Sequence, residues 1–416
     1  MNTTWPLSVW QRFMVNGERR RPGRATDPWF TVNAVLLVEG ALDLRILAAA
    51  ADDLVARHDL LRARVDLDTG TQVVEDSLPA SVELLDGWSG AAEELLHHPV
   101  PVATGSSPLV LRVVRRSSHE HLLAAHLHHL FGDPVTLWRI LRDLGDLYAA
   151  RCGAPSPPPP TGQYGEYAAH EAAVAGAYEA EAGRWWRDAL ADVALATASA
   201  TARDAPFAVR RPVLSGDDLA RLEAWARARR STLFAGLLAV LTERMAAHVV
   251  AGTGDHLLFN TLFERRDGPR WRTMAGPCLA PSYVAVPLTA TADPHAVALA
   301  LSAAVRYSRY PTWTLDRVTR GSVNFATFVP FVELIPQLRP DTIPFGPASA
   351  VVAAAAGERD SGETSFLGLR FRRDTDGSLV AHVRGDGVGW TGQAVRTVLD
   401  GMPAGVRAVA GVRSAG

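Results

Sequence analysis

The spacing of apolar residues predicts a chain in which helices and strands are mixed from one end to the other. In Asp43–Arg57 the apolar positions recur at the spacing of one helical face, and Leu60–Val65 then changes to strand-like alternation. Both patterns return in the second half of the chain, so the sequence predicts an α/β fold. Helical patterns are found at Glu166–Leu190, twice within Asp217–Ala247 with a cap-like Ser231-Thr232, and at Thr391–Leu399; strand patterns are found at Leu257–Phe263 and Leu379–Val383.

One strand, loop and helix follow each other closely in the first half. The apolar runs Pro108–Val114 and Leu122–His129 are separated by a polar segment, and they indicate adjacent antiparallel strands. Gly132-Asp133-Pro134 ends the second run, and Val135–Leu147 has helical spacing. The sequence therefore predicts a tight loop between a strand and a helix.

The chain is long enough for more than one domain. Its 416 residues are about three times the usual length of a single domain, which favours two. The segment 153–162 carries five prolines, at position 155 and from 157 to 160. Such a segment is typical of a stiff connector and marks a candidate boundary.

Composition indicates a folded chain and excludes several classes of function. Hydrophobic residues make up 48% and charged residues 21% of the chain, which is ordinary globular usage. All 42 basic residues are Arg, because the chain contains no Lys, so neither a lysine Schiff base nor a P-loop lysine can form. A net charge of −2 lacks the positive excess of nucleic-acid-binding proteins, so we expect no nucleic-acid partner.

The cysteines and the N-terminus bear on the compartment. Cys152 and Cys278 lie far apart, with no Cys or His at metal-finger spacing, so neither a disulfide framework nor a zinc site is indicated. No cationic leader followed by an apolar stretch begins the chain, and no apolar run has the length of a membrane span. We therefore expect a cytoplasmic protein with no membrane partner.

The predicted loop carries the residues best suited to chemistry. His128, His129 and Asp133 form an HHxxxD pattern at the exit of the strand. Alternation along the strand places His126 and His128 on one face and His129 on the other, so the adjacent histidines meet different surroundings. A neutral imidazole can take a proton from an attacking amine or hydroxyl, which makes His129 the candidate base. Asp133, after Gly132 at a sharp turn, is expected to hold the loop by pairing with a buried Arg.

Other interpretations of these residues stay open. All three histidines can be satisfied structural groups, and His126 with His128 has the same-face geometry of a metal site, although no third ligand is evident. His97-His98 repeats the doublet in a predicted loop without an Asp. Asp76-Ser77-Leu78 imitates a phosphopantetheine attachment site but follows a strand-like segment rather than opening a helix. No GxSxG, GxGxxG or HExxH motif in the required context was found.

Taken in order, the motifs resemble those of the condensation domains of nonribosomal peptide synthetases, within the chloramphenicol-acetyltransferase-like superfamily. The match is good in the first half and loose later, at Ala275–Cys278 and Ser322–Phe325. The matching segments are Pro6-Leu7-Ser8 with Gln11 (PLSxxQ), Arg57–Arg62 (RHxxLR), His128–Asp133 (HHxxxDG without its last residue), Tyr164–Ala168 (YxDYA) and Arg184-Trp185-Trp186 with Leu190 (YWxxxL).

The resemblance implies two acetyltransferase-like lobes, 1–170 and 171–416, that form a V-shaped pseudo-dimer with a central tunnel. It makes His129 the catalytic residue, exposed inside that tunnel. It assigns His128, Gly132 and Asp133 to the architecture of the site, with Arg62 as the ionic partner of Asp133. It places Asn324 at the substrate.

The resemblance also implies the reaction and its partners. A freestanding condensation enzyme of natural-product biosynthesis would transfer an acyl or aminoacyl group from a thioester to an amine or hydroxyl acceptor. The phosphopantetheine would come with a carrier protein in trans, or with coenzyme A, so the chain itself would bind no cofactor and no metal. Pro134 stands where the family has Gly, and it fixes φ and removes an N–H. A catalytically silent docking module and an epimerase-like variant therefore remain as alternatives.

Overall fold

The protein is described by a computed structural model, in which the chain forms two compact units. Unit 1 comprises Met1–Gly176, Glu264–Ala280 and Leu338–Ser361, and unit 2 comprises Ala177–Phe263, Pro281–Gln337 and Gly362–Gly416. The described residues are 2–20, 22–23, 25–102, 106–191, 198, 202–252, 254–289, 293–309, 329–335, 342–356, 367–374 and 376–411.

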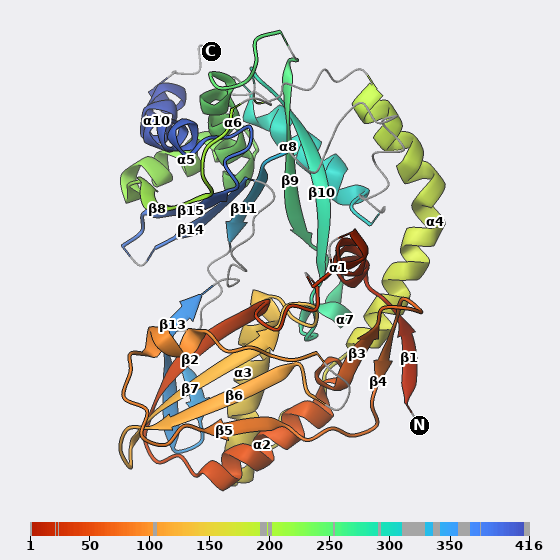
Figure 1. The fold of residues 1–416 in the computed structure, drawn as a ribbon, viewed down its shortest axis with the longest axis vertical. Coiled ribbons are helices and arrows are strands. Elements are labelled where there is room, and N and C mark those ends of the chain that lie inside the picture. The colour runs from red at the N-terminus through yellow and green to blue at the C-terminus, as the bar shows by residue number, and fades with distance from the viewer. Residues whose placement is uncertain are drawn as a thin grey trace. The chain divides into compact units, whose positions relative to one another are not determined.

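Unit 1 is built on a six-stranded sheet in the order β12-β13-β2-β7-β6-β5 (Figure 1). Its two central strands, β2 and β7, are buried on both faces, which explains their nearly continuous apolar sequences. They pair antiparallel from Thr31 opposite His128 to Glu39 opposite Glu120. The strands are β2 (Thr31–Glu39), β5 (Ser81–Leu84), β6 (Leu109–Arg115), β7 (Glu120–His128), β12 (Ile343–Phe345) and β13 (Ala348–Ala356).

A small sheet and several helices complete unit 1. The small sheet has the order β1-β4-β3. Helices α2 and α3 pack against each other, and α3 also contacts β2, β7 and β12. The remaining elements are β1 (Thr3–Pro6), β3 (Ala63–Asp66), β4 (Thr71–Val74), α1 (Val9–Arg20), α2 (Leu44–Arg57), η1 (Asp59–Arg62), η2 (Ala92–Leu96), α3 (Pro134–Arg151), α7 (Pro269–Arg272) and the first part of α4 (Tyr164–Ala191).

Unit 2 has its own six-stranded sheet, in the order β10-β9-β11-β14-β15-β8. Helices α5, α6 and α10 lie together beside β8 (Figure 1), and their apolar faces contribute to one large core. The elements are β8 (Phe207–Leu214), β9 (His256–Glu264), β10 (Leu279–Pro287), β11 (Phe331–Ile335), β14 (Gly368–Arg373), β15 (Leu379–Gly385), α5 (Gly216–Ala228), α6 (Leu233–Ala246), α8 (Pro294–Arg306) and α10 (Gly392–Gly411).

Most predicted elements are confirmed, with differences at their ends. The two strands before the HHxxxD loop are β6 and β7, which pair antiparallel, and Thr232 caps α6 as expected. The strand predicted at Leu60–Val65 is wrong in its first half, because Leu60 and Leu61 are both buried within the 3-10 turn η1. The proline-rich segment 153–162 joins α3 to α4 within unit 1, and the division between the units lies later, inside α4.

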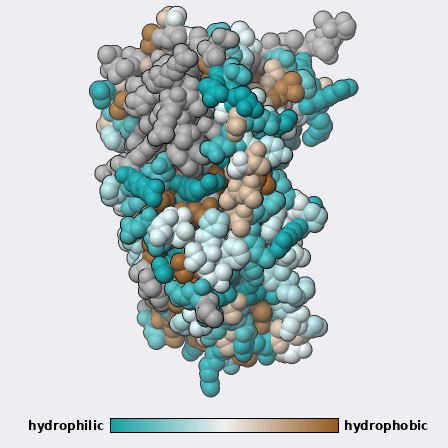
Figure 2. Space-filling model, turned by 90° about the vertical axis from the view of Figure 1, so that its right-hand side faces the viewer, coloured by the Kyte–Doolittle hydropathy of each residue, from teal (hydrophilic) through white to brown (hydrophobic). Residues whose placement is uncertain are grey.

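The described helices and surface were compared with what a membrane span requires. None of the described helices is both long and apolar enough to span a bilayer. On the side of the molecule shown in Figure 2, the described residues are mainly hydrophilic, with hydrophobic residues scattered among them. Single exposed hydrophobic residues of this kind are normal at protein surfaces.

Candidate active site

The HHxxxD motif forms a tight loop between β7 and α3, within unit 1. Strand β7 ends at His128, and the backbone N–H of His129 donates to the carbonyl of Phe30 at 2.8 Å. The N–H of Phe131 then donates to the carbonyl of His128 at 2.9 Å, which closes the turn. Asp133 follows as the N-cap of α3. Both ends of the loop are therefore fixed by regular elements.

His128 is held as a neutral structural side chain. Its Nδ1 accepts from the N–H of Leu130 at 3.2 Å, so its Nε2 carries the proton and donates to the carbonyl of Asp27 at 3.0 Å. Burial lowers the pKa of His128 to about 4. Both ring nitrogens are used in hydrogen bonds with the backbone, and the architectural role of this residue stays a prediction.

The His129 ring lies between two aromatic side chains and is fixed by its own loop. Its centroid is 4.8 Å from that of Phe30, with the rings stacked, and 5.0 Å from that of Trp10. The Trp10 Nε1–H also donates to the backbone carbonyl of His129 at 2.8 Å. Nδ1 of His129 lies 2.6 Å from the carbonyl of Gly132. Because a carbonyl only accepts, Nδ1 carries a proton, and in the neutral form of the ring the lone pair would lie on Nε2.

The prediction of an exposed His129 is wrong for this structure. The residue is 1% exposed, and the aromatic rings that cover it belong to the same unit. Sequence reasoning missed this because Trp10 and Phe30 come from distant segments whose packing no local pattern reveals.

Gly132 is required for space rather than for an unusual turn. Its φ is not among the positive values of the chain. A Cβ built at this position would lie 1.9 Å from Cδ2 of Leu127, a side chain of the preceding strand. The loop therefore packs directly on β7, and a larger residue at position 132 would require the Leu127 side chain or the loop to shift.

Asp133 is a fully buried carboxylate that joins the loop to the segment 264–280. Both of its oxygens accept from Nη2 of Arg266, at 2.9 and 3.0 Å. Oδ1 also accepts from the N–H and the hydroxyl of Thr136, and Oδ2 from the N–H of Cys278. Burial would raise the pKa of Asp133, but the charge and hydrogen bonds of Arg266 and the hydrogen bonds from Thr136 hold it below its ordinary value.

The predicted pairing of Arg62 with Asp133 is wrong. Arg62 instead donates to three backbone carbonyls, those of Val55, Glu75 and Asp76. These bonds tie the end of α2 to the segment after β4. Asp133 does pair with a buried arginine, as predicted. The sequence could not show that this arginine comes from the segment 264–280.

Arg266 was missed by sequence reasoning. Its Nη1 donates to Glu264 at 2.7 Å and its Nη2 also donates to the carbonyl of Gly276 at 2.7 Å. Burial would lower the pKa of Arg266, but the charge of Asp133 raises it above its usual range. The loose motif match at Ala275–Cys278 was the available signal in the sequence that this segment belongs to the site. Its Gly276 packs closely on Tyr164, because a Cβ at this position would lie 2.0 Å from the Tyr164 ring.

Residues of the PLSxxQ and YxDYA motifs form a buried hydrogen-bond network that includes the segment 264–280. The Tyr164 hydroxyl lies 2.7 Å from Oγ of Ser8 and 3.0 Å from the carbonyl of Pro277. The Tyr167 hydroxyl donates to Glu171 at 2.9 Å. These motif residues hold the segment that pairs with Asp133, so their roles are structural.

The RHxxLR motif is structural as well. Nε2 of His58 lies 2.8 Å from Asp143, a buried residue of α3. The carboxylate of Asp59 accepts from the N–H groups of Tyr164 and Gly165, the first residues of α4, both at 3.0 Å. A carboxylate at a helix N-terminus satisfies donors that the helix itself leaves unpaired.

The other candidate residues lie away from this loop or outside the described residues. His126 is fully buried, and burial lowers its pKa to about 3. The residues that the structure describes include no group of three His, Cys, Asp or Glu side chains that could hold a metal ion. His97-His98 lies in a loop after η2, and Asp76-Ser77-Leu78 in a loop after β4. Asn324, the predicted substrate contact, lies outside the described residues.

Comparison with protein families identifies the chain. The model of the condensation domain matches residues 4–295. The chain belongs to the condensation-domain family. Members of this family generally catalyse amide-bond formation, and some are inactive.

A curated relative of this condensation-domain chain is the phosphinothricin tripeptide synthetase PhsB of Streptomyces viridochromogenes. The two are 32% identical over 206 residues, which cover 46% of this chain and 17% of the synthetase. The chain thus spans less than a fifth of that relative's length.

Solved structures confirm the predicted fold class. SgcC5 of Streptomyces globisporus superposes with a TM-score of 0.75 at 18% identity, covering 98% of both chains. The X-domain of teicoplanin biosynthesis, solved in complex with OxyB, superposes with a TM-score of 0.72 at 21% identity, covering 98% of this chain and 93% of its own. The mixed α/β fold with two sheets is therefore that of condensation domains and their chloramphenicol-acetyltransferase-like lobes.

Proposed function

We propose that this chain is a condensation enzyme that transfers an acyl or aminoacyl group from a phosphopantetheine thioester to an amine or hydroxyl acceptor, with His129 as the base. The observation that carries the proposal is the 2.6 Å contact between Nδ1 of His129 and the carbonyl of Gly132. In the neutral ring this contact favours the tautomer in which Nε2 has the lone pair and can accept a proton. A base needs that lone pair when the acceptor attacks.

The reaction balances without any further reagent. The acceptor nitrogen or oxygen attacks the thioester carbonyl, and Nε2 of His129 takes its proton. The carbon–sulfur bond then breaks, and the pantetheine thiolate leaves and takes up the proton. The product is an amide or an ester, and the imidazole returns to its neutral form.

The surrounding structure supports a fixed position for the imidazole. The Asp133–Arg266 pair and the cap of α3 hold the C-terminal end of the loop, and β7 holds its other end. Because the ring is 1% exposed, the proposal includes a rearrangement of the side chains around it when the reactants bind. The donor would be a carrier protein in trans or a coenzyme A thioester, in the cytoplasm, within secondary metabolism.

The test replaces His129 and uses another histidine as a control. His129→Ala is expected to abolish acyl transfer, while His119→Ala, an exposed residue in the turn between β6 and β7, should keep wild-type turnover. Intact-mass detection of acyl loss from loaded carrier proteins, with a panel of amines and alcohols as acceptors, measures the reaction. Far-UV circular dichroism verifies that both variants fold. Unchanged turnover of His129→Ala would reject the assignment.

A second candidate function is a silent recruitment module, and the burial of His129 favours it. The X-domain with the same fold was solved in complex with OxyB, so this fold can bind a partner enzyme. Under this alternative the chain binds a carrier protein or partner enzyme and yields no product with any acceptor. Product formation by the wild-type chain excludes it, and an epimerase-like variant would change the configuration of a loaded aminoacyl group instead.

A further inference from the structure

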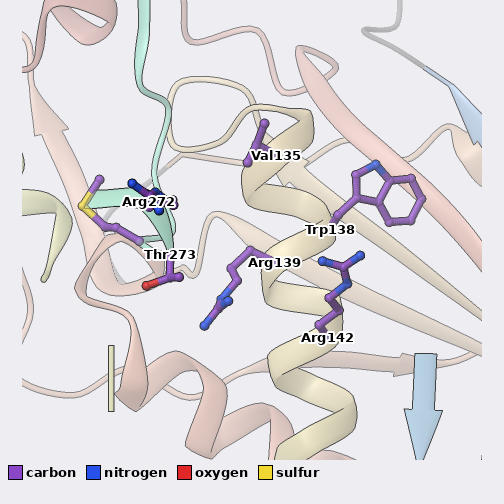
Figure 3. A pocket seen from close by; sticks show the side chains of 7 residues that line it. Val135, Trp138, Arg139, Arg142, Arg272 and Thr273 are labelled. Atoms are coloured by element: carbon purple, nitrogen blue, oxygen red, sulfur yellow. The ribbon is translucent and has the colours of Figure 1, made fainter. Parts of the chain in front are cut away.

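Two aromatic side chains from distant segments contact the imidazole of His129. The ring centroid of Trp10, in α1, lies 5.0 Å from that of His129 at an interplanar angle of 35°, and Phe30, just before β2, lies at 4.8 Å and 28°. At these angles the aromatic rings turn their faces rather than their edges toward the imidazole. The pocket shown in Figure 3 is lined by residues of α3 and of the segment 272–274, and not by these three side chains. The imidazole therefore lies against aromatic faces and not in that pocket.

The backbone fixes both aromatic residues relative to His129. The indole N–H of Trp10 donates to the backbone carbonyl of His129 at 2.8 Å. The backbone N–H of His129 donates to the carbonyl of Phe30 at 2.8 Å, and the N–H of Phe30 donates to the carbonyl of Asp27 at 2.9 Å. Trp10 is also buried, so moving it would leave a buried donor and a buried acceptor unpaired. Trp10, Phe30 and His129 thus form one fixed arrangement, the aromatic bracket.

Burial by itself would keep His129 neutral. Two neighbouring histidines show this effect, since burial lowers the pKa of His126 to about 3 and the pKa of His128 to about 4. His128 also contacts Phe30, but at an interplanar angle of 81°, and it contacts Phe131 at 60°. The near-parallel contact with two aromatic rings therefore distinguishes the imidazole of His129 from that of His128.

The face of an aromatic ring attracts a cation. Its π electrons carry partial negative charge, and a cation within about 6 Å of the ring centroid is stabilised, most strongly where water is excluded. The centroids of both rings of the bracket lie within this distance of the imidazole centroid. When His129 takes a proton from the acceptor, its ring becomes an imidazolium cation against these faces. The hydrogen bond from Nδ1 to the carbonyl of Gly132 is compatible with both forms of the ring.

We propose that Trp10 and Phe30 stabilise the imidazolium form of His129 through the faces of their rings, which makes them positioning residues of the proposed reaction. The inference rests on the proposed function, because it assumes that His129 takes the proton of the acceptor. That proton moves to Nε2 and later to the pantetheine sulfur, so the bracket itself gains and loses no atom. Since the rings contact the faces of the imidazole, the rearrangement that admits the reactants would open the Nε2 edge and leave both rings in place.

A series of fluorinated phenylalanines at position 30 tests the inference without turnover. One, two or three fluorine atoms, introduced by nonsense suppression, withdraw electron density from the ring face and keep its shape nearly constant. NMR of the full chain with labelled histidine follows the titration of His129, whose signal is assigned with His129→Ala. His126 and His128 do not interfere above pH 5, because their pKa values are about 3 and 4. We expect the titration midpoint of His129 to fall with each fluorine, by about one pH unit in total.

The same fluorinated series at Phe13 is the matched control. Phe13 is also in α1, and its ring contacts Trp10 at a centroid distance of 6.0 Å. Fluorination there changes the volume and polarity of the aromatic cluster to the same extent. The titration midpoint of His129 should stay the same throughout the Phe13 series.

The charges on the elements around the bracket are the same in every member of the Phe30 series. The segment before β2 carries Asp27, α1 carries Arg12, and the loop carries Asp133, which is paired with Arg266. A change in the midpoint therefore reports on the ring at position 30. A midpoint that does not change with fluorination overturns the proposal, and so does a His129 that stays neutral down to pH 5.

Two conventional variants extend the test to Trp10. Trp10→Phe keeps an aromatic face beside the imidazole and loses the indole N–H, whereas Trp10→Leu loses both. We expect Trp10→Phe to titrate His129 within about half a pH unit of wild type and Trp10→Leu to lower the midpoint by about one unit. Far-UV circular dichroism verifies that both variants fold. Equal midpoints in the two variants would overturn the assignment of Trp10.

Kinetics separates failure of this inference from failure of the proposed function. With a loaded carrier protein and an amine, kcat should fall along the Phe30 series by about three- to tenfold, because a weaker base is less effective in proton transfer. KM should stay the same, since the bracket does not touch the reactants. A constant kcat in an active enzyme overturns the role in proton transfer. If wild type yields no product, the proposed function fails while the NMR titrations still decide whether the rings stabilise the imidazolium.

Discussion

At the scale of single residues, the loop depends on a buried ion pair that the sequence only half revealed. The pattern HHxxxD was sufficient to predict that Asp133 holds the loop and pairs with a buried arginine. It could not identify Arg266, because that residue is more than a hundred positions away and nothing local distinguishes it from Arg62. The exposure of His129 was predicted wrongly for the same reason, since Trp10 and Phe30 reach it only through the fold.

We expect Asp133→Asn to lower the free energy of unfolding by about 3 to 5 kcal/mol at pH 7, because it removes the buried carboxylate that pairs with Arg266 and leaves only the more exposed Glu264. The pKa of Asp133 lies below its value in the unfolded chain. Its contribution to stability is therefore fully present above about pH 4 and is lost as the pH falls through the folded-state pKa. Other carboxyl groups with lowered pKa values, such as Asp143, also lose their contribution in acid. Urea unfolding between neutral and acid pH should therefore show a smaller loss of stability in Asp133→Asn than in wild type.

Arg62→Gln is the control for this assignment. It removes bonds to backbone carbonyls and does not change the surroundings of Asp133. The variant should therefore keep the acid dependence of wild type, whatever its stability at pH 7. A weaker acid dependence in Arg62→Gln than in wild type, or an acid dependence in Asp133→Asn as strong as that of wild type, would contradict the pairing with Arg266.

At the scale of elements, the start of α3 explains how the chain accommodates Pro134. The sequence predicted a strand, a loop and a helix in this order, and all three are present, with Asp133 as the cap and Pro134 as the first helical residue. Proline is favoured there because its φ suits a helix and the N–H that it lacks would have no partner within the helix. The departure from the family's glycine is therefore compatible with the fold of the loop.

We expect Pro134→Gly to lower the free energy of unfolding by about 1 kcal/mol, because glycine enlarges the conformational freedom of the unfolded chain at this position. Turnover should not rise, since the loop is held by Asp133 rather than by residue 134. Chemical denaturation together with the acyl-transfer assay measures both quantities. Higher turnover in Pro134→Gly would show that proline impairs the site.

At the scale of the whole molecule, the sequence predicted the class of fold better than the path of the chain. Period-2 and helical patterns identify elements because they arise from local burial. They carry no sign that residues 264–280 and 338–361 return to unit 1. The returning strands could not be predicted, because β13 has an alanine-rich sequence without clear alternation, and pairing with β2 makes it a strand.

Because residues 264–280 and 338–361 complete unit 1, we predict that the first 176 residues cannot form a stable unit alone. A fragment of residues 1–176 would lack β13, so β2, which has a buried, apolar sequence, would become an edge strand paired only with β7. It would also lack Arg266, so the buried Asp133 would have no counter-charge. We expect this fragment to aggregate or to unfold without cooperativity, in contrast to the full chain under the same conditions. Circular dichroism melts and size-exclusion chromatography measure this, and a monomeric fragment with a sharp transition would show that the returning segments are dispensable.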